Sequence, residues 1–295
     1  MPDGAASAAF DLIVVGAGAA EGLRVLLVES APQVGGTTAI SGGMVWVPAN
    51  HLMAEAGRPD SLEAARTYLH HTVPPDDDPA PLEAFLEHGD EAIRYLEART
   101  ALRLRPVMAY PDYYPDLPGA TPGGRVLEPL PFDARSLGKS LALLRPPLSE
   151  FMLFGGMMVH RSDMPHLRRA ARSPASAWHV AKLLARHALE RTRAPRGTTL
   201  HLGNALAGWL LESALDLGVE LRTATAVTRL LREAGRVNGV EIEAGGRRQQ
   251  LRAGKAVIQA GGGFSHDAAL RCRCLPAAAG ALSACSRTPS PTCSR

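Results

Sequence analysis

Residues 11–16 read Asp-Leu-Ile-Val-Val-Gly, and residues 17–20, Ala-Gly-Ala-Ala, follow directly. The apolar run predicts a buried strand, and the glycines predict a tight turn at its end. A second apolar run, Leu23–Val28, ends in Glu29. This order is typical of an adenine-dinucleotide site, where the glycine turn lets the backbone approach a pyrophosphate and the acid binds a ribose hydroxyl. The stretch therefore predicts a nucleotide-binding α/β fold.

The distance between the glycine turn and the acid is unusually short. The acid normally follows the turn by about 20 residues, whereas Gly16 and Glu29 are 29 − 16 = 13 residues apart. A parallel crossover needs at least about 10–12 residues, and only seven lie between Val15 and Leu23. We therefore expect either an antiparallel hairpin or an extended loop with a parallel return. Both would lack the helix N-terminus that binds pyrophosphate, and Glu21 occupies the third glycine position.

Composition indicates a globular protein with one large domain or two small ones, because 46% of the 295 residues are hydrophobic. The net charge of +3 is too small to indicate nucleic-acid binding. No apolar run approaches the roughly 18 residues of a membrane span, and the N-terminus lacks a signal-peptide pattern, so we expect a cytoplasmic protein.

All four cysteines lie in the last 24 residues, at Cys272, Cys274, Cys285 and Cys293. Their spacing matches no common zinc pattern, so no metal is expected. Residues 275–295 are rich in Ala, Ser, Pro, Thr and Cys and have no hydrophobic period. We expect a disordered tail, and the composition also fits a sequence outside the reading frame of the upstream fold.

Hydrophobic periodicity predicts helices and strands along the rest of the chain. Helices are expected at 61–72, 81–98, 175–193 and 204–217. Strands are expected at 45–47, 102–108, 219–222, 227–232, 237–242, 247–251 and 255–259, and a long proline-rich loop at 110–133. The last strand is expected to be buried and leads into a glycine turn at 260–263. One sheet built from both ends of the chain is therefore expected.

The helix expected at 175–193 has an apolar face and a basic face. The apolar face, expected to point inward, carries Trp178, Ala181, Leu184 and Ala188. The basic face carries Lys182, Arg186, Arg191 and Arg193. Such a face can contact anionic lipid, but we favour an ordinary solvated face.

Four blocks resemble the flavoprotein family of fumarate reductases and 3-ketosteroid dehydrogenases, and more closely its steroid branch. They are residues 11–20 with 23–29; 35–48, reading GGTTAISGGMVWVP; 111–133, reading PDYYPDLPGATPGGRVLEPLPFD; and 256–266, reading AVIQAGGGFSH. The resemblance implies an α/β fold: a Rossmann-like FAD-binding domain with a largely helical insertion. It fades after about residue 275, so the capping domain that carries the family's catalytic base is expected to be missing.

The implied domain limits are residues 1–50 for the first part of the FAD-binding domain, 51–195 for the insertion, 196–270 for the second part and 271–295 for the tail. By the same resemblance, several groups of residues would contact FAD. The pyrophosphate and ribose contacts are Gly16, Gly18, Ala19 and Glu29. The contacts running beside the phosphates toward the isoalloxazine are Gly36, Thr37, Thr38, Ser41, Gly42 and Gly43. The adenine contacts are Ala226 and Val227, through their backbone, and the closing turn is Ala260, Gly261 and Gly262. The glycines could equally make ordinary tight turns, and the hydroxyl residues could cap a helix.

Tyr113 matches a steroid-dehydrogenase tyrosine that hydrogen-bonds the catalytic tyrosine base. The implied reaction is desaturation beside a ketone, in which a base removes a proton, an acid stabilises the enolate and hydride passes to flavin N5. Tyr113 could also simply pack within its proline-rich loop. The substrate would be a small ketone or steroid, and we expect little or no turnover by this chain. A fumarate-reductase-like flavoprotein acting on a small unsaturated acid, or a noncatalytic remnant, are the alternatives.

Overall fold

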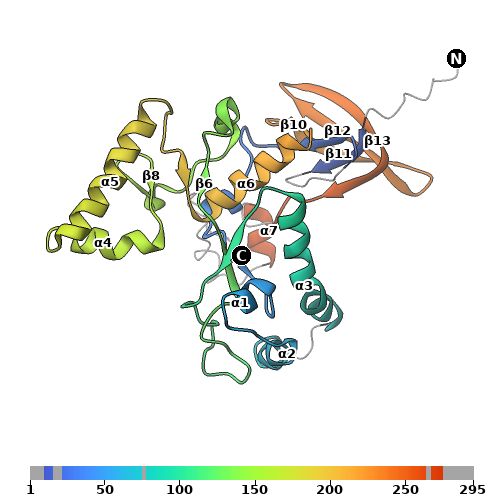
Figure 1. The fold of residues 1–295 in the computed structure, drawn as a ribbon. Helices are drawn as coiled ribbons and strands as arrows, with labels where there is room; N and C mark the ends of the chain where they lie inside the picture. Colours follow the sequence, from blue (N-terminus) through green and yellow to red (C-terminus); the bar gives the residue numbers. More distant parts are fainter. Residues whose placement is uncertain (1–9, 16–21, 75–77, 264–266, 275–295) are drawn as a thin grey trace, which may run out of the picture. The chain divides into compact units, whose positions relative to one another are not determined.

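The computed structural model describes residues 10–15, 22–74, 78–263 and 267–274. The chain divides into two compact units, one formed by residues 1–32 with 217–295 and the other by residues 33–216 (Figure 1). The domain limits and the tail expected from the sequence stay predictions.

A mixed six-stranded sheet in the order β10-β2-β1-β13-β12-β11 forms the first unit. Its strands are β1 (Phe10–Val15), β2 (Val25–Val28), β10 (Glu220–Arg222), β11 (Ala226–Glu233), β12 (Arg236–Ala244) and β13 (Arg247–Gln259), and helix α7 spans Ala268–Cys274. The first four strands of that order are parallel, and β13, β12 and β11 form an antiparallel meander. The sheet is therefore assembled from both ends of the chain, as expected.

The second strand returns parallel to the first. Leu12 pairs with Val25 and Val15 pairs with Val28, so the hairpin alternative is wrong and the parallel return is correct. The start of β2 is fixed beside the start of β1, because the Arg24 backbone N–H donates to Asp11 Oδ2 at 2.9 Å.

Strand β13 corrects two expectations about residues 247–259. It is one continuous strand, pairing with β12 up to Arg252 and with β1 from Ala253 onward. Its second half was expected to be buried, yet Lys255, Ile258 and Gln259 are exposed. Beyond Arg252, β13 no longer pairs with β12. Among the described residues, its second half therefore has a neighbouring strand, β1, on one side only.

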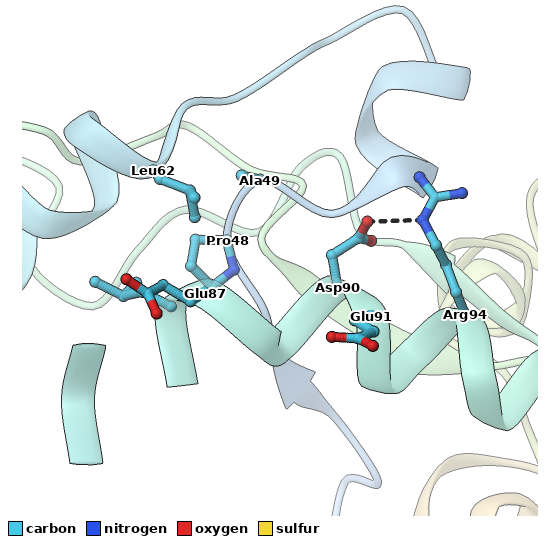
Figure 2. Close-up of a pocket in the computed structure, with 8 residues that line it drawn as sticks. Pro48, Ala49, Leu62, Glu87, Asp90, Glu91 and Arg94 are labelled. Atoms are coloured by element: carbon cyan, nitrogen blue, oxygen red, sulfur yellow. Dashed lines mark hydrogen bonds and ion pairs between the residues drawn. The ribbon is translucent and has the colours of Figure 1, made fainter. Parts of the chain in front are cut away.

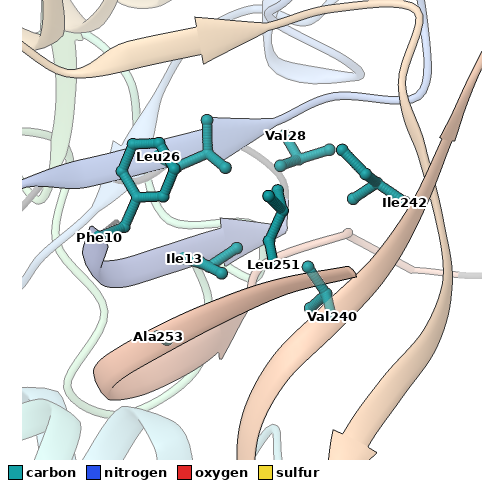
Figure 3. Packing of buried hydrophobic residues seen from close by; sticks show 8 residues of the cluster. All are labelled: Phe10, Ile13, Leu26, Val28, Val240, Ile242, Leu251 and Ala253. Atoms are coloured by element: carbon teal, nitrogen blue, oxygen red, sulfur yellow. The ribbon is translucent and has the colours of Figure 1, made fainter. Parts of the chain in front are cut away.

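The core of the first unit joins the parallel and antiparallel parts of the sheet (Figure 3). Its buried members are Phe10, Ile13, Leu26, Val28, Val240, Ile242, Leu251 and Ala253. In β2, β12 and β13 the members are two residues apart and share one face because side chains alternate along a strand. In β1 a register shift between Phe10 and Leu12 lets Phe10 join Ile13. This packing fixes the ends of the parallel strands, where the candidate site lies.

The second unit combines helices with short strands. Its helices are α1 (His51–Glu55), α2 (Leu62–His70), α3 (Ala80–Arg99), α4 (Met164–Arg169), α5 (Pro174–Arg191) and α6 (Leu202–Asp216). Its strands are β3 (Val45–Trp46), β4 (Leu104–Pro106), β5 (Val126–Pro129), β6 (Phe132–Asp133), β7 (Met152–Leu153), β8 (Met157–Met158) and β9 (Thr199–Leu200). Strands β5 and β6 occupy the end of the segment expected to be a loop at 110–133.

A buried cluster ties the small sheet β3-β5-β4 to α3. It contains Val47, Ile93, Leu102, Leu104 and Leu127. The amphipathic pattern of α3 predicts this packing, since Ile93 lies on its apolar face. No helix in the part of the chain that the structure describes has both the length and the apolar character needed to cross a bilayer.

The orientation of α5 differs from the sequence prediction. The helix buries Ser176, Leu183 and His187 and leaves Trp178 and Leu184 exposed. Polar anchors select this face: His179 Nε2 lies 2.9 Å from Asp163 Oδ1, and His187 Nε2 lies 3.3 Å from the Phe154 carbonyl oxygen. The predicted inward face is therefore the outward one.

Candidate functional site

The four parallel strands of the first unit end at one edge of the sheet. In register, Arg222 pairs with Val28, Val28 with Val15, and Val15 with Gln259. The Ala260 backbone N–H donates to the Val15 carbonyl oxygen at 2.6 Å. Open α/β sheets bind ligands beyond the carboxyl ends of their strands. The segments that follow β1, β2 and β13 therefore begin side by side at a position suited to a ligand.

Three of the predicted pyrophosphate contacts cannot be placed at this edge. Gly16, Gly18 and Ala19 lie outside the described residues, as does Glu21. Their assignment stays a prediction.

Glu29 is held firmly at the end of β2. Its backbone N–H donates to the Arg222 carbonyl oxygen at 2.9 Å. Its Oε1 accepts hydrogen bonds from the Ala31 backbone N–H at 2.8 Å and from the Ser30 hydroxyl at 3.2 Å. Its Oε2 has no hydrogen-bond partner among the described residues. One oxygen thus orients the carboxylate while the other remains able to accept from a ribose hydroxyl.

Ala226 and Val227 begin β11 close to Glu29. The preceding Thr225 donates its backbone N–H to the Glu29 carbonyl oxygen at 3.0 Å. The Val227 side chain packs against the hydrophobic cluster of Figure 3. A ligand at this position would therefore meet the backbone of Val227 rather than its side chain.

The turn after β13 contains Ala260, Gly261 and Gly262, all exposed. Gly262 has φ +79°, and a Cβ on either glycine would meet no atom within 4 Å. The left-handed backbone conformation explains why residue 262 is a glycine. The space around Gly261 and Gly262 is open.

The GGTT segment in the second unit presents two free hydroxyls. Thr37 precedes a 3₁₀ turn at Thr38–Ile40 but makes no side-chain capping bond. Neither threonine hydroxyl has a hydrogen-bond partner among the residues that the structure describes, and both threonines are exposed. Gly36 has φ +45° with open space around it, and Arg145 Nη1 donates to the Gly36 carbonyl oxygen at 3.1 Å. The helix-capping alternative for Thr37 is not supported.

Ser41 and Gly43 instead support the start of α6. The Ser41 hydroxyl donates to the Thr38 carbonyl oxygen at 2.9 Å and accepts from the Gly43 N–H at 3.0 Å. A Cβ on Gly43 would lie 2.5 Å from the Gly203 nitrogen, and the Gly203 N–H donates to the Ser41 carbonyl oxygen at 3.1 Å. These two residues therefore have packing roles, and Gly42 lies between them.

Two residues near this segment were missed from the sequence. Asn204 is fully buried and donates from Nδ2 to the carbonyl oxygens of Ala39 at 3.2 Å and Arg145 at 2.7 Å. Arg145 supplies the cation beside the GGTT turn. Neither residue stands in a motif, so no local signal could have identified them.

A buried ion cluster fixes the loop that carries Tyr113. Arg125 donates to both carboxylate oxygens of Asp60, at 2.7 and 3.0 Å, and to Asp112 at 2.9 Å. Asp112 also accepts from Trp46 Nε1 at 2.7 Å. Burial would raise the pKa of Asp60, but the hydrogen bonds from Arg125 and the Ala49 N–H outweigh it and lower that pKa.

Tyr113 itself points outward from this fixed loop. Its side chain is 84% exposed, and its hydroxyl has no hydrogen-bond partner among the described residues. The neighbouring Tyr114 N–H donates to the Tyr68 hydroxyl at 3.2 Å. Packing within the loop, the simpler explanation for Tyr113, does not fit this exposure.

A pocket of about 340 Å³ lies elsewhere in the second unit, between α2, α3 and the segment after β3 (Figure 2). Its lining is Pro48, Ala49, Leu62, Leu86, Glu87, Asp90, Glu91 and Arg94. The Arg94 Nε donates to Asp90 at 2.8 Å. Three carboxylates against one guanidinium would repel a diphosphate, so this pocket does not suit the cofactor.

Comparison with known families identifies the cofactor class. The FAD binding domain family matches residues 11–293. The chain belongs to this FAD-binding family. FAD is accordingly its cofactor, and the predicted family and fold class are confirmed.

Relatives of this FAD-binding chain include the 3-oxosteroid 1-dehydrogenase of Mycobacterium tuberculosis strain H37Rv, 38% identical over 89% of this chain and 48% of the relative. The 4-oxocyclohex-2-ene-1-carboxylate 5-dehydrogenase of Sinomonas cyclohexanicum is 35% identical over 91% of this chain and 47% of the relative. The crystal structure of 3-ketosteroid delta1-dehydrogenase from Sterolibacterium denitrificans matches with a TM-score of 0.80 and 35% identity, covering 90% of this chain and 50% of that one. These relatives match the predicted resemblance to steroid dehydrogenases, and the chain spans about half the length of each.

Proposed function

We propose that this chain is the FAD-binding part of a dehydrogenase that desaturates a 3-oxosteroid next to its ketone. The reaction removes a proton from the carbon beside the ketone and a hydride from the next carbon. FAD, when bound, supplies the hydride acceptor at N5. The observation that carries the proposal is the strand-end edge of the first unit, where Glu29 keeps one carboxylate oxygen free beside the segments expected to contact FAD.

The residues of the first unit fit the adenosine half of the cofactor. We assign the free Glu29 oxygen to a ribose hydroxyl, and the backbone of Ala226 and Val227 to the adenine. The open turn at Ala260, Gly261 and Gly262 would close over the cofactor, because a glycine there lets a ligand approach the backbone.

In the second unit we assign the two free threonine hydroxyls to phosphate oxygens. Thr37 and Thr38 would each donate one hydrogen bond, and Gly36 leaves room beside them. Ser41, Gly42 and Gly43 would position this segment through their contacts with the start of α6 rather than through contacts with the cofactor alone.

Tyr113 would act on the substrate side. A phenol hydroxyl can hold or pass a proton, and the anchored loop gives Tyr113 a fixed base. Its assigned role is to hydrogen-bond the group that removes the proton.

The test uses the purified chain with FAD, an artificial electron acceptor and one of two ketones. 4-Androstene-3,17-dione represents the steroid substrates. 4-Oxocyclohex-2-ene-1-carboxylate, the compound in the name of the Sinomonas cyclohexanicum relative, represents the smaller cyclic ketones. Addition of the part of a relative that this chain does not match, as a separate chain, should support dye reduction with the steroid and not with the carboxylate. Steroid-dependent dye reduction by the chain alone would contradict the expected low turnover, and preference for the carboxylate would contradict the steroid assignment.

A further inference from the structure

The GGTT segment of the second unit lies among stretches of sequence that carry positive charge and no acid. Residues 33–43, which contain it, have no charged side chain. Residues 137–148 contain Lys139 and Arg145, residues 195–211 contain Arg196, and neither stretch contains Asp or Glu. Because the charges nearest a ligand dominate its electrostatic energy, the place where these three stretches meet favours an anion.

Hydrogen bonds bring the three stretches together. Val34 pairs with Leu144 in a parallel bridge. The Val34 N–H donates to the Leu143 carbonyl oxygen at 2.8 Å, and the Arg145 N–H donates to the Val34 carbonyl oxygen at 2.9 Å. At the start of α6, the Asn204 amide donates to one carbonyl oxygen of residues 33–43 and to one of residues 137–148. The backbone that carries Arg145 is therefore fixed beside the GGTT segment.

The Arg145 side chain contacts the GGTT segment and leaves most of its donors unused. Its Nη1 donates to the Gly36 carbonyl oxygen at 3.1 Å. Among the residues that the structure describes, this guanidinium has no carboxylate within ion-pair distance, and its other N–H groups have no hydrogen-bond partner. A guanidinium carries five N–H donors in a planar fork that matches phosphate oxygens. Arg145 therefore places an unpaired cation next to the residue that precedes Thr37.

A second cation supports the same backbone. Arg196 Nη2 donates to the Leu144 carbonyl oxygen at 3.3 Å, and its Nη1 donates to Asn204 Oδ1 at 3.0 Å. Burial lowers the pKa of the Arg196 guanidinium, and in the described part of the chain no carboxylate lies within ion-pair distance to offset this effect. Arg196 and Asn204 thus hold residues 144 and 145 without neutralising the charge of Arg145.

A purely structural role explains Arg145 poorly. Arg58 also donates to a single backbone carbonyl, that of Met108 at 2.9 Å, and its side chain is exposed to water. Arg145 makes the same kind of bond but is half-buried. Partial removal of a charged group from water costs free energy unless an opposite charge compensates it. The half-buried guanidinium therefore indicates an anionic ligand.

We propose that Arg145 binds the diphosphate of FAD beside the hydroxyls of Thr37 and Thr38. The diphosphate is anionic, and its oxygens accept parallel N–H bonds from a guanidinium. Arg196 and Asn204 are positioning residues, which act through the backbone of Arg145 and do not contact the cofactor. This inference rests on the proposed function, because that function assigns the two threonine hydroxyls to phosphate oxygens.

Titration of the full chain with FAD, followed by quenching of flavin fluorescence, tests the role of the Arg145 charge. Arg145→Gln removes the charge but keeps an N–H donor, and it should raise the Kd about tenfold or more. Arg145→Lys keeps the charge, and the Kd should stay within about threefold of that of the unmodified chain. The matched control Arg58→Gln, at an exposed position of the same unit, should bind FAD like the unmodified chain.

The salt dependence of binding gives a readout that needs no substitution. Because salt screens a contact between a partly exposed cation and a phosphate, the Kd of the unmodified chain should rise between about 50 and 500 mM NaCl. The rise should be smaller in Arg145→Gln, which has lost this contact. Equal thermal midpoints of the variants and the unmodified chain establish that each variant folds.

Three results overturn the inference. They are an unchanged Kd in Arg145→Gln, an equal loss of affinity in Arg145→Gln and Arg145→Lys, and a Kd of the unmodified chain that does not depend on salt. If Glu29→Gln weakens FAD binding and Arg145→Gln does not, this inference fails and the proposed function stands. Absence of saturable FAD binding by the unmodified chain overturns both.

Discussion

Replacement of Arg125 by methionine should destabilise the second unit strongly. The guanidinium is 1% exposed, donates three hydrogen bonds to Asp60 and Asp112, and lies 5.7 Å from the Trp46 ring centroid. Its loss leaves two buried carboxylates without their cation. Removal of one partner of a buried ion pair costs about 3–5 kcal/mol, a large share of the roughly 5–15 kcal/mol that stabilises a typical domain.

Urea unfolding, followed by tryptophan fluorescence and by far-ultraviolet circular dichroism, measures this loss. The matched control is Arg94→Met, which removes a guanidinium from an exposed pair with Asp90 and should cost about 0–1 kcal/mol. The triple variant Arg125→Met/Asp60→Asn/Asp112→Asn should be more stable than Arg125→Met, because no buried charge then lacks a partner. Equal stabilities of Arg125→Met and Arg94→Met would show that the buried ion cluster does not stabilise the second unit.

The pH dependence of the same variant has a defined sign. In the unmodified chain the pKa of Asp60 lies below its usual value, so its contribution is present above the unfolded pKa and is lost as pH falls through the folded pKa. In Arg125→Met the effect of burial is no longer outweighed by the guanidinium, and the pKa of Asp60 should rise. The stability of the variant should then increase on mild acidification, opposite to the Asp60 contribution in the unmodified chain.

Three further changes test the site and its support. Gly203→Ala places a Cβ 1.9 Å from the Thr38 carbonyl oxygen and should lower the thermal midpoint by an amount equivalent to about 1–3 kcal/mol. The control Gly261→Ala, with open space around it, should leave the midpoint unchanged. Equal midpoints of the two variants would contradict a packing role for Gly203. Burial lowers the pKa of His201 to about 4, so on acidification the unfolded chain takes up a proton on this imidazole before the folded chain does. Stability should therefore fall by up to about 3 kcal/mol between pH 6.5 and 4. In His201→Phe the dependence of stability on pH should be weaker, and an unchanged dependence in unfolding titrations would contradict the lowered pKa. Thr37→Val with Thr38→Val should weaken FAD binding about tenfold or more with no loss of stability, since two hydroxyl donors are removed from an exposed segment; unchanged affinity in a fluorescence titration would remove both residues from the site.

The sheet of the first unit could be predicted because its signals are local. Apolar runs at 11–15 and 255–259, each followed by glycines, indicate strands that end in turns, and the structure pairs them. The continuity of β13 could not be predicted, because residues 252–254 read Arg-Ala-Gly and resemble a break. Backbone pairing with two different neighbours, β12 and then β1, holds the strand together there.

The face of α5 shows where periodicity fails. Trp178, Ala181 and Leu184 form the more apolar side, and hydrophobicity alone turns that side inward. The structure instead buries Leu183 and His187, because their side of the helix contacts groups far along the chain. Tertiary partners, which no local pattern contains, decided the orientation.

The candidate site, too, could be predicted only where its signal is local. Glu29 was identified from its place after an apolar run, and the structure sets it at the edge where the strands end. Ser41 and Gly43 were grouped with the cofactor contacts because they share a motif with Thr37. Their packing against Gly203 depends on a helix much later in the sequence, so the motif alone could not separate the two roles.

Titration of the full chain with FAD, followed by quenching of flavin fluorescence, tests most directly whether the strand-end edge binds the cofactor. We expect saturable binding that Glu29→Gln weakens about tenfold, the equivalent of one charge-assisted hydrogen bond. The control Glu233→Gln, at the exposed end of β11, should bind FAD like the unmodified chain. A colourless protein that never saturates, or equal affinities for Glu29→Gln and the unmodified chain, would contradict the account.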